Sequence, residues 1–388
     1  MNYWVKKSLK KFKYLLKDNG FYDESTARER VKRFWAAKKE EKKVVLFIYD
    51  RKSNTSRYRS ENICKALEGS KMWRGVGFGM SEIGSFSVLL DAADLVVVVR
   101  VVDSGRLKRI VKRVHQRNVK VIYDVDDLVV GGNWLRPMME ATGVRVEKNW
   151  KAQGDDYEAA AKRTDGFTTT NDFLGRKLEE SFDRSYKVIY NSIGEEFMGD
   201  YSGVKHDGFV IGYFSGSPTH ANDFGVVAPE LTQLLEKYPE MRLLLVGDME
   251  LPASMWKFIN NGQIIRRAKV NYLKLPELIA SVDVNIAPLL INDFTNAKSE
   301  LKYFEAAAAK VVTVATPSFT FKQAIVDGEN GFLAEQGEWY AKIEYLYQHP
   351  EERQKIARKA KKEALKIYHG ANIMKQAEEA YEYFMKTK

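Results

Sequence analysis

Three carboxylates follow the apolar run VKVIY, at Asp124, Asp126 and Asp127. Carboxylates this close together repel one another, and such crowding is tolerated where the group binds a cation, sugar hydroxyls or a substrate proton. We therefore expect a catalytic group among Asp124, Asp126 and Asp127. Helix capping by Asp126 or Asp127 is the alternative, because Asp is a favoured N-cap residue.

A second stretch, NAKSELKYFEAAAA, combines cationic and acidic side chains at helical spacing. If a helix starts near Ala297, Ser299 lies at its positively charged end, and Lys298, Lys302 and Glu305 lie within a turn or two of one another. Lysines at a helix start suit a diphosphate, and a glutamate farther along suits a pair of vicinal hydroxyls. Together these residues predict a binding site for a nucleotide diphosphate sugar.

The loop SGSPTH places small and polar residues between a predicted strand and a predicted helix, at Ser215, Gly216, Ser217 and His220. Small residues let the backbone approach a phosphate and offer N–H groups at the helix start. Neither GxxxxGK[ST] nor GxGxxG follows a first strand, so an ATP-hydrolysing P-loop is not supported.

Two arginines follow the first predicted strand, at Arg57 and Arg59, close to a helix expected to begin near Ser56. In this position they are placed to receive an anionic ligand. Bonding to loop carbonyls or acidic neighbours alone is an equally open interpretation.

The elements that position these residues follow from an alternation of short β-branched runs with amphipathic stretches. Continuous apolar strands separated by helices indicate parallel sheets covered on both faces. The alternation occurs twice and predicts an α/β chain with two doubly wound domains, residues 44–200 and 201–388. The predicted strands are residues 44–49, 95–100, 119–125, 166–170, 187–191, 209–214, 241–247, 262–268, 282–289, 311–315 and 331–334.

Composition excludes several classes of protein. The chain has 388 residues, of which 45% are hydrophobic and 12% aromatic, and this excludes a disordered or collagen-like chain. A single cysteine, Cys64, allows no intrachain disulfide and fits a reducing compartment. The five histidines show no metal-binding spacing, so we predict no metal.

Most of the net charge of +10 lies in residues 1–43, which carry 14 Lys/Arg and 6 Asp/Glu. We predict a basic helical arm there, since Val5, Leu9, Phe12 and Leu16 share one helix face. Such a helix suits an anionic membrane surface through residues 1–20, although packing on the body is as plausible an interpretation. No apolar run of membrane-spanning length or signal-peptide pattern occurs, so we expect a cytoplasmic protein, peripheral at the inner face of the membrane.

Residues 104–117 are a second basic segment, with eight Lys/Arg and one acid between Arg100 and Lys120. A face of this kind suits phosphates or acidic lipid, and a solvated helix face is the default interpretation of any charge run.

The segments VIYNSIGEEF, IGYFSGSPTH, LLLVGD, NAKSELKYFEAAAAKVVTVAT and IVDGENGFL resemble motifs of family 4 glycosyltransferases, also called group 1, which have the GT-B fold. The resemblance covers roughly residues 44–385. It implies two Rossmann-like domains facing a central cleft, the N-terminal one binding the acceptor and the C-terminal one the nucleotide sugar. It also implies that Glu305 binds the ribose hydroxyls, that Lys302, with Lys298, neutralises the leaving diphosphate, and that Gly216 approaches the phosphates.

The resemblance therefore implies a metal-independent, retaining, hexosyltransferase-like enzyme that needs no cofactor. Its acceptor would be a glycan or a lipid-linked molecule in cell-surface polysaccharide or glycoconjugate synthesis. In the family's E-x7-E pair the first acid precedes Glu305 by eight residues, and this chain has Ala297 there. That departure keeps a catalytically inactive GT-B scaffold as an alternative.

Two further alternatives are a sugar-nucleotide epimerase or phosphorylase, which shares the two-domain cleft, and a basic nucleic-acid-binding protein. The sequence pI of 9.2 supports the last one. Nucleic acid is nevertheless an unlikely partner, because residues 44–388 carry little of the charge and show no recognised nucleic-acid-binding motif.

Overall fold

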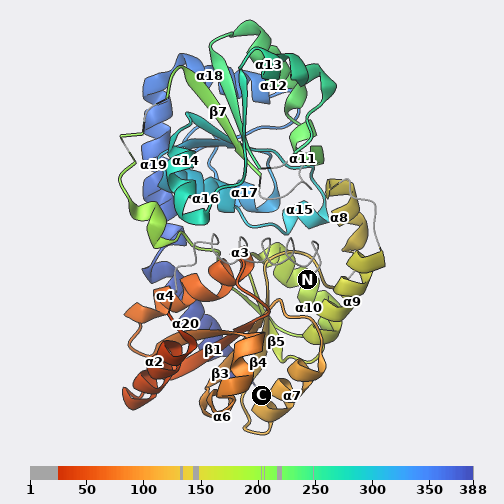
Figure 1. Ribbon diagram of the computed structural model, residues 1–388, viewed down its shortest axis with the longest axis vertical. Helices are drawn as coiled ribbons and strands as arrows, with labels where there is room; N and C mark the ends of the chain where they lie inside the picture. Colours follow the sequence, from red (N-terminus) through yellow and green to blue (C-terminus); the bar gives the residue numbers. More distant parts are fainter. Residues whose placement is uncertain are drawn as a thin grey trace, which may run out of the picture.

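The computed structural model describes residues 25–131, 134–142, 148–201, 203–204, 206–215, 221–247 and 249–387. These residues form two lobes, each built on a six-stranded parallel sheet with helices on both faces (Figure 1). The predicted α/β class with two doubly wound domains is confirmed. The helix expected within residues 1–20 lies outside the described residues.

The N-terminal sheet has the strand order β2-β1-β3-β4-β5-β6. The inner strand β1 is covered on both faces: Leu46 and Ile48 pack into one apolar cluster, and Val45 and Phe47 into another. This double burial explains why the strands read as continuous apolar runs. The strands are β1 (Lys43–Tyr49), β2 (Trp73–Gly79), β3 (Leu95–Val99), β4 (Val121–Val125), β5 (Gly166–Thr169) and β6 (Tyr186–Val188).

The strand β2 was not predicted, because its sequence WRGVGFG has glycines where a strand usually has β-branched residues. Two of these glycines allow close packing. A Cβ on Gly75 would lie 2.9 Å from Cys64 Cα, and one on Gly77 would lie 2.7 Å from Ser60 Oγ. Local propensity is therefore overridden by the helix that packs across this strand.

The helices of this lobe begin with α2 (Ala27–Lys39), which lies within the segment predicted as a basic helical arm, residues 1–43. Capping side chains explain several of the starts, for example Ser104 at α7 and Asn171 at α10. The other elements are α3 (Asn54–Ser56), the π-helical turn η1 (Arg57–Glu61), α4 (Asn62–Ala66), η2 (Leu67–Gly69), α5 (Met80–Ile83), η3 (Gly84–Phe86), α6 (Val88–Ala92), α7 (Gly105–His115), α8 (Leu135–Thr142), α9 (Lys148–Ala161) and α10 (Asp172–Phe182).

The C-terminal sheet has the strand order β12-β11-β10-β7-β8-β9. Its strands are β7 (Phe209–Phe214), β8 (Met241–Val246), β9 (Ile264–Arg267), β10 (Val284–Ala287), β11 (Val312–Ala315) and β12 (Phe332–Leu333). Its helices are α11 (Ala221–Gly225), α12 (Ala228–Lys237), α13 (Trp256–Asn260), α14 (Leu275–Ala280), α15 (Asp293–Asn296), α16 (Leu301–Ala308), α17 (Phe319–Ala324) and α18 (Trp339–Gln348), with short turns η4 (Glu195–Met198), η6 (Ala253–Met255) and η7 (Tyr272–Lys274).

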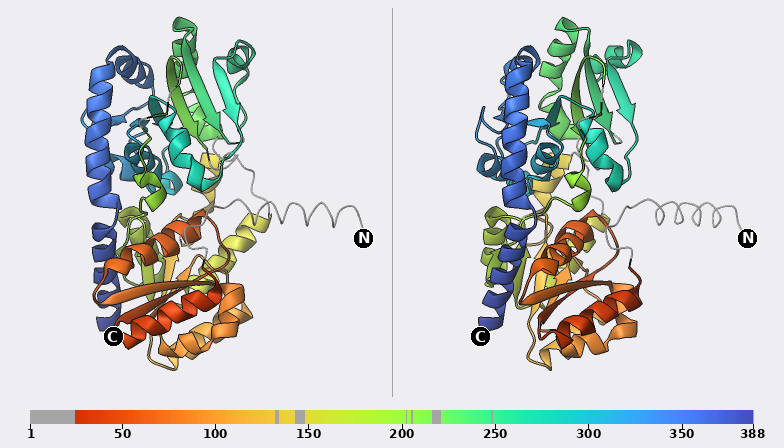
Figure 2. Two further views of the ribbon diagram at one scale, coloured as in Figure 1. Left: turned by 60° about the vertical axis from the view of Figure 1, so that its left-hand side comes forward. Right: turned by 90° about the vertical axis from the view of Figure 1, so that its left-hand side faces the viewer.

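The last two helices connect the lobes. α19 (Pro350–Tyr368) packs on α16, whereas α20 (Ala371–Lys386) runs back along the N-terminal lobe (Figure 2). Ile373, Ala377, Tyr381 and Phe384 of α20 pack with the core side chains of the N-terminal sheet. The prediction that residues 201–388 all belong to the C-terminal domain is therefore wrong for α20, because helical periodicity shows an apolar face but not what it packs against.

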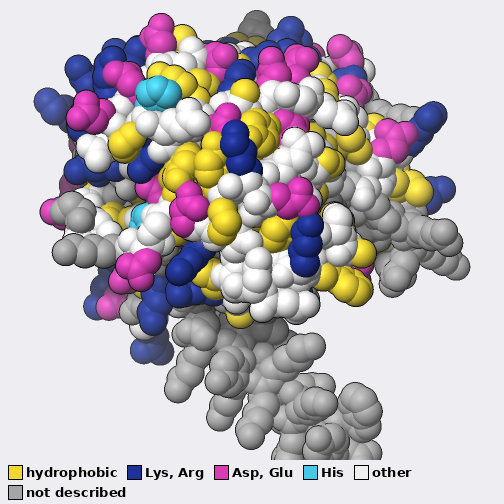
Figure 3. Space-filling model, turned by 90° about the horizontal axis from the view of Figure 1, so that it is seen from above, with side chains coloured by type: hydrophobic (Ala, Val, Ile, Leu, Met, Phe, Trp, Pro, Cys, Tyr) yellow, Lys and Arg dark blue, Asp and Glu magenta, His cyan; other side chains and the backbone are white. Residues whose placement is uncertain are grey.

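Acidic and basic side chains are interspersed over the end of the molecule formed by the C-terminal lobe (Figure 3).

The basic helix α7 belongs to the N-terminal lobe. Its Arg113 binds Asp91 with Nη2 at 2.5 Å, so part of the charge of the helix is neutralised locally. Among the described helices, none is both long enough and apolar enough to cross a bilayer.

Candidate active site

The carboxyl ends of the two sheets face each other, and a cleft of about 360 Å³ lies between them. Ligands bind at this edge in open α/β sheets, because loops and helix starts converge there. Side chains from both lobes line it: Asn54, Thr55, Tyr58, Asp126, Asp127 and Asn191 from the N-terminal side, and Ser215, Lys269, Tyr272, Lys298, Ser299, Lys302 and Glu305 among those of the C-terminal side. Most of the residues predicted from the sequence are thus brought together.

The helix expected to start near Ala297 begins four residues later. α15 ends at Asn296 and α16 starts at Leu301, so Lys298 and Ser299 lie in the connection between the two helices. Lys302 and Glu305 are in the first two turns of α16 and remain on the cleft side.

The Lys302 ammonium group has no hydrogen-bond partner among the described residues, and its Nζ is buried. The Nζ atom lies 4.5 Å from the centroid of the Tyr213 ring. Burial lowers the pKa of Lys302 to about 8, because a desolvated cation is unfavourable. A buried cation facing a cleft is ready to be paired with an anionic ligand.

Glu305 is 5% exposed and accepts a hydrogen bond from the hydroxyl of Tyr58, which belongs to the opposite lobe. Burial raises the pKa of Glu305 to about 7, although the bond from Tyr58 acts in the opposite direction. Tyr58 also packs edge-on against Tyr272, with ring centroids 6.0 Å apart. The cleft is therefore closed at this point by a contact between the lobes.

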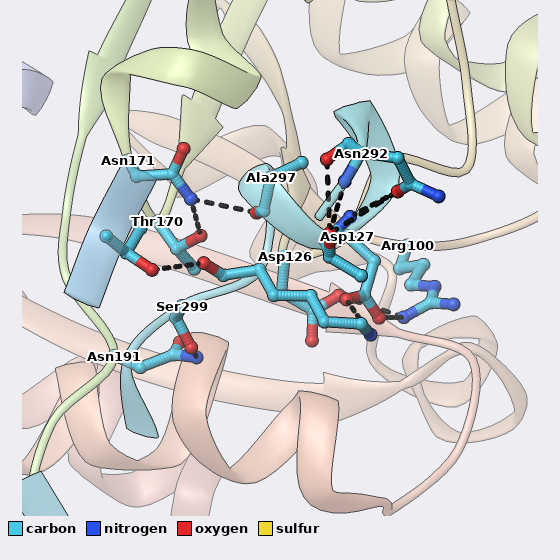
Figure 4. Close-up of polar contacts among 12 residues, drawn as sticks. Arg100, Asp126, Asp127, Thr170, Asn171, Asn191, Asn292, Ala297 and Ser299 are labelled. Atoms are coloured by element: carbon cyan, nitrogen blue, oxygen red, sulfur yellow. Dashed lines mark hydrogen bonds and ion pairs between the residues drawn. The ribbon is translucent and has the colours of Figure 1, made fainter. Parts of the chain in front are cut away.

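Asp126 and Asp127 lie at the cleft and share one arginine. Arg100 Nη1 is 3.0 Å from Asp126 Oδ1 and 3.1 Å from Asp127 Oδ2, and Lys298 Nζ is 3.4 Å from Asp127 Oδ1 (Figure 4). Burial raises the pKa of Asp126. Burial acts on Asp127 in the same direction, but Lys298 and Arg100 outweigh it and lower the pKa of Asp127 to about 2. Asp127 thus stays ionised, whereas Asp126 is the more basic carboxylate of the pair.

Asp124 is placed differently from its two neighbours. It is 1% exposed, accepts hydrogen bonds from Arg59 Nε at 2.9 Å and Nη2 at 2.8 Å, and accepts a third from Thr168 Oγ1 at 2.7 Å. A carboxylate with these partners is not available to a substrate, so Asp126 and Asp127 are the candidates that remain of the three aspartates. Asp124 lies within the buried strand β4, whereas Asp126 and Asp127 follow the end of that strand at Val125.

The two arginines predicted on the acceptor side are also buried. Arg59 forms an ion pair with Asp124 and donates a hydrogen bond to the carbonyl of Ile189. Arg57 packs on Tyr272, with its Cζ 3.9 Å from the ring centroid. Both side chains are 0% exposed. Arg59 therefore bonds a carbonyl and an acidic neighbour, as the alternative interpretation has it. Neither side chain is exposed to an acceptor, since the π-helical turn η1 is buried.

Ser215 follows β7, is 4% exposed and lines the cleft. Gly216, Ser217 and His220 lie outside the described residues, and their assignment to phosphate binding stays a prediction.

Asparagines that were not among the predicted site residues form hydrogen bonds between the lobes (Figure 4). Asn191 Nδ2 donates to Ser299 Oγ at 2.9 Å, and Asn171 Nδ2 donates to the carbonyl of Ala297 at 2.8 Å. Asn292 Nδ2 donates to the carbonyl of Pro137 at 2.8 Å. Asn171 and Asn292 were recognisable as N-cap residues, but nothing in one sequence indicates which partner their amide nitrogens find across a cleft.

In the part of the chain that the structure describes, no cluster of three or more His, Cys, Asp or Glu side chains could hold a metal ion. Among the described residues that line the cleft, the cationic ones are Lys269, Lys298 and Lys302.

Comparison with known proteins finds similarity to sugar-transferring enzymes. The family model described as "Glycosyl transferase-like" matches residues 229–379. The alpha-monoglucosyldiacylglycerol synthase of Acholeplasma laidlawii is 23% identical over 171 residues, which are 43% of this chain and 42% of that protein. The chain spans about half, or less, of the length of the curated relatives it matches.

Solved structures show the same fold. Anabaena Alr3699/HepE, crystallised with UDP-glucose, superimposes with a TM-score of 0.58 at 15% identity, over 88% of this chain and 99% of that one. WaaG, described as a glycosyltransferase involved in lipopolysaccharide biosynthesis, gives a TM-score of 0.58 at 14% identity, over 87% and 99% of the two chains. The two-sheet architecture and these matches are those of the GT-B fold.

Proposed function

We propose that this chain, which has the GT-B fold and is of the group 1 glycosyltransferase type, transfers a sugar from a nucleotide diphosphate sugar to an acceptor hydroxyl. The observation that carries the proposal is the closed cleft in which Lys302, Lys298 and Glu305 of one lobe face Asp126 and Asp127 of the other. Cations and a hydroxyl-binding carboxylate on one wall suit a donor, and carboxylates on the opposite wall suit an attacking hydroxyl.

The chemical roles follow from charge. Cleavage of the bond between sugar and diphosphate leaves negative charge on the diphosphate, and Lys302 and Lys298 stabilise that charge in a site with little water. When the donor binds, Glu305 accepts hydrogen bonds from the ribose hydroxyls instead of from the Tyr58 hydroxyl. Asp126, whose pKa is raised by burial, positions the acceptor hydroxyl and accepts its proton. The lysines supply the positive charge that a metal supplies elsewhere, so the proposed reaction is metal-independent.

We further propose retention of configuration, since the acceptor then attacks from the side on which the diphosphate leaves and no protein nucleophile is required. A glycan or a lipid-linked molecule is the proposed acceptor. The synthase of Acholeplasma laidlawii, by its name a glycolipid-forming enzyme, supports the lipid-linked form. A peripheral position on an anionic membrane, through residues 1–20, belongs to the same proposal.

The donor part is tested by a thermal-shift screen of the purified chain against UDP, GDP, dTDP, ADP and CMP and their common sugars. A ligand at 100 times its dissociation constant adds about 2.7 kcal/mol to the free energy of unfolding. One nucleotide series should raise the melting temperature of the wild type and of Glu179→Ala, a variant on the outer helix α10, but not of Glu305→Ala. The absence of a shift with every nucleotide would contradict the proposal and favour the inactive scaffold.

The membrane part has its own test. Deletion of residues 1–20 should weaken sedimentation with vesicles containing phosphatidylglycerol and leave nucleotide binding unchanged. Equal sedimentation of both forms would remove the membrane from the proposal.

A further inference from the structure

A second cavity, of about 380 Å³, adjoins the candidate active site within the N-terminal lobe. Its walls include Trp134, Trp150, Tyr157 and Gln153, with Asp50 and Arg51 at the loop after β1. Thr55 lines both this cavity and the cleft between the lobes, so the two spaces meet there. The volume is within the range of small-molecule sites, roughly 300–1,000 Å³.

One face of α9 forms much of the wall. Trp150, Gln153, Gly154 and Tyr157 follow one another at steps of three, one and three residues, which places them on the same side of the helix. Gly154 makes room for a ring from the neighbouring segment, since a Cβ at this position would lie 2.0 Å from Trp134 Cζ2. The glycine therefore lets Trp134 pack directly on the helix and complete an aromatic wall.

The aromatic wall is both accessible and polar at its edges. Trp150 is 40% exposed, so part of its ring is accessible to a ligand in the cavity. Gln153 Nε2 donates to the Tyr157 hydroxyl at 3.1 Å, so amide and phenol groups lie side by side. Flat apolar faces with hydrogen-bonding groups beside them match a ring that has C–H faces and hydroxyl edges.

The charges at the cavity are balanced. Arg100 reaches the wall, with its Cζ 5.8 Å from the Tyr157 ring centroid, but its charge is paired with Asp126 and Asp127. Asp50 and Arg51 have opposite signs and adjoin one another in sequence. A neutral ligand fits this balance better than a phosphate or a carboxylate.

The same contacts tie the cavity to the reacting groups. Arg100 touches the aromatic wall on one side and holds Asp126 on the other, with Nη1 to Oδ1 at 3.0 Å. A ligand lying on Trp150 and Tyr157 thus has Asp126 beyond it, toward the donor cleft.

We propose that this cavity binds a neutral saccharide ring of the acceptor, packed on Trp150, Trp134 and Tyr157. The inference rests on the proposed glycosyl transfer and specifies the class of its acceptor: the end that receives the new sugar is itself a sugar. A lipid-linked acceptor would accordingly be a glycolipid whose outermost group is a saccharide.

Saturation-transfer NMR tests this with methyl glycosides of glucose, galactose and N-acetylglucosamine, with and without UDP. At least one glycoside should bind the wild type, and Trp150→Ala should weaken its binding at least ten-fold. Trp256→Ala is the matched control, because Trp256 is 60% exposed on α13 of the other lobe and its loss should leave glycoside binding unchanged. Gln153→Ala should give a smaller loss of the same sign.

Failure of this inference and failure of the proposed function are distinguishable. If UDP binds but no glycoside does, or if Trp150→Ala and the wild type bind a glycoside equally, the saccharide site is overturned while the donor site stands. Preferential binding of glycerol 3-phosphate over every glycoside would also overturn it. If no nucleotide binds, the transferase proposal fails, and glycoside binding that depends on Trp150 would still establish the cavity as a saccharide site.

Discussion

Arg59 binds both oxygens of Asp124 inside the N-terminal lobe, with Nε and Nη2 at 2.9 and 2.8 Å, and neither side chain reaches solvent. Asp124 lies only two residues before Asp126, which faces the cleft. β4 ends at Val125, so Asp124 belongs to the buried strand and Asp126 to the loop beyond it. The end of the strand thus separates a structural carboxylate from a chemical one within a short stretch of sequence.

This separation predicts opposite behaviour of two neighbouring variants. Asp124→Asn leaves a buried guanidinium without its counter-charge and should lower the free energy of unfolding by about 3–5 kcal/mol. Asp126→Asn should change stability much less and abolish most of the transfer activity. Urea unfolding and a transfer assay on both variants check this. A stable Asp124→Asn protein without activity would contradict the structural role.

The contrast also shows what one sequence can and cannot provide. Both sheets were predictable, because buried parallel strands leave runs such as LVVVV that loops and helices do not have. The positions of Lys302 and Glu305 on the cleft side of one helix were predictable from spacing. The orientation of Asp124 and Arg59 was not, since it depends on strand ends and on a π-helical turn that local patterns do not encode.

Contacts between the lobes were beyond sequence reasoning for a related reason. Tyr58 precedes Glu305 by 247 residues, and no periodicity relates them. The same holds for α20, whose apolar face was evident but whose packing partner was not. Long-range contacts depend on how complete domains dock, and a one-sequence pattern describes only one element at a time.

The bond between Tyr58 and Glu305 predicts a gain of donor affinity on its removal. The Tyr58 hydroxyl donates to the Glu305 carboxylate, which is proposed to bind the ribose hydroxyls. The donor must therefore displace the Tyr58 hydroxyl from Glu305. Tyr58→Phe removes this competitor, whose net hydrogen-bond energy is about 1 kcal/mol or somewhat more to a charged group, and should tighten binding of the nucleotide by up to about ten-fold. Isothermal titration of wild type and variant with the nucleotide found in the screen measures this. Weaker binding by Tyr58→Phe would show that Tyr58 assists the donor.

The buried position of Lys302 at the cleft predicts that its removal slows the chemical step. Its ammonium group is buried without a hydrogen-bond partner among the described residues and is proposed to meet the diphosphate. Lys302→Ala should lower kcat/KM by about 10²–10³-fold, the usual effect of removing one group that stabilises developing charge. Lys375→Ala, an exposed lysine of α20, is the control. Because the pKa of Lys302 is lowered to about 8, donor binding by the wild type should also weaken as pH rises above 8. Unchanged kcat/KM in Lys302→Ala would exclude this role.

Glu300 predicts a pH dependence of stability that is separate from catalysis. It lies before α16, is 4% exposed, and burial raises its pKa from 4.5 to about 7. Between these two pH values the folded chain keeps a proton that the unfolded chain has released, so the free energy of unfolding falls as pH rises from about 4.5 to 7. The decrease is at most about 3–4 kcal/mol for one group, since each pKa unit corresponds to about 1.4 kcal/mol.

Glu300→Gln carries no titrating proton at this position and should flatten that slope. Urea unfolding of wild type and variant at intervals between pH 5 and pH 7.5 gives the two curves, and Glu305→Gln in parallel separates the second buried glutamate, whose pKa is also about 7. The two variants should each remove part of the slope, and the double variant should remove more than either. A Glu300→Gln protein with the slope of the wild type would mean that the folded chain holds this carboxyl ionised, and its burial beside Tyr368 would then have to be relieved by water.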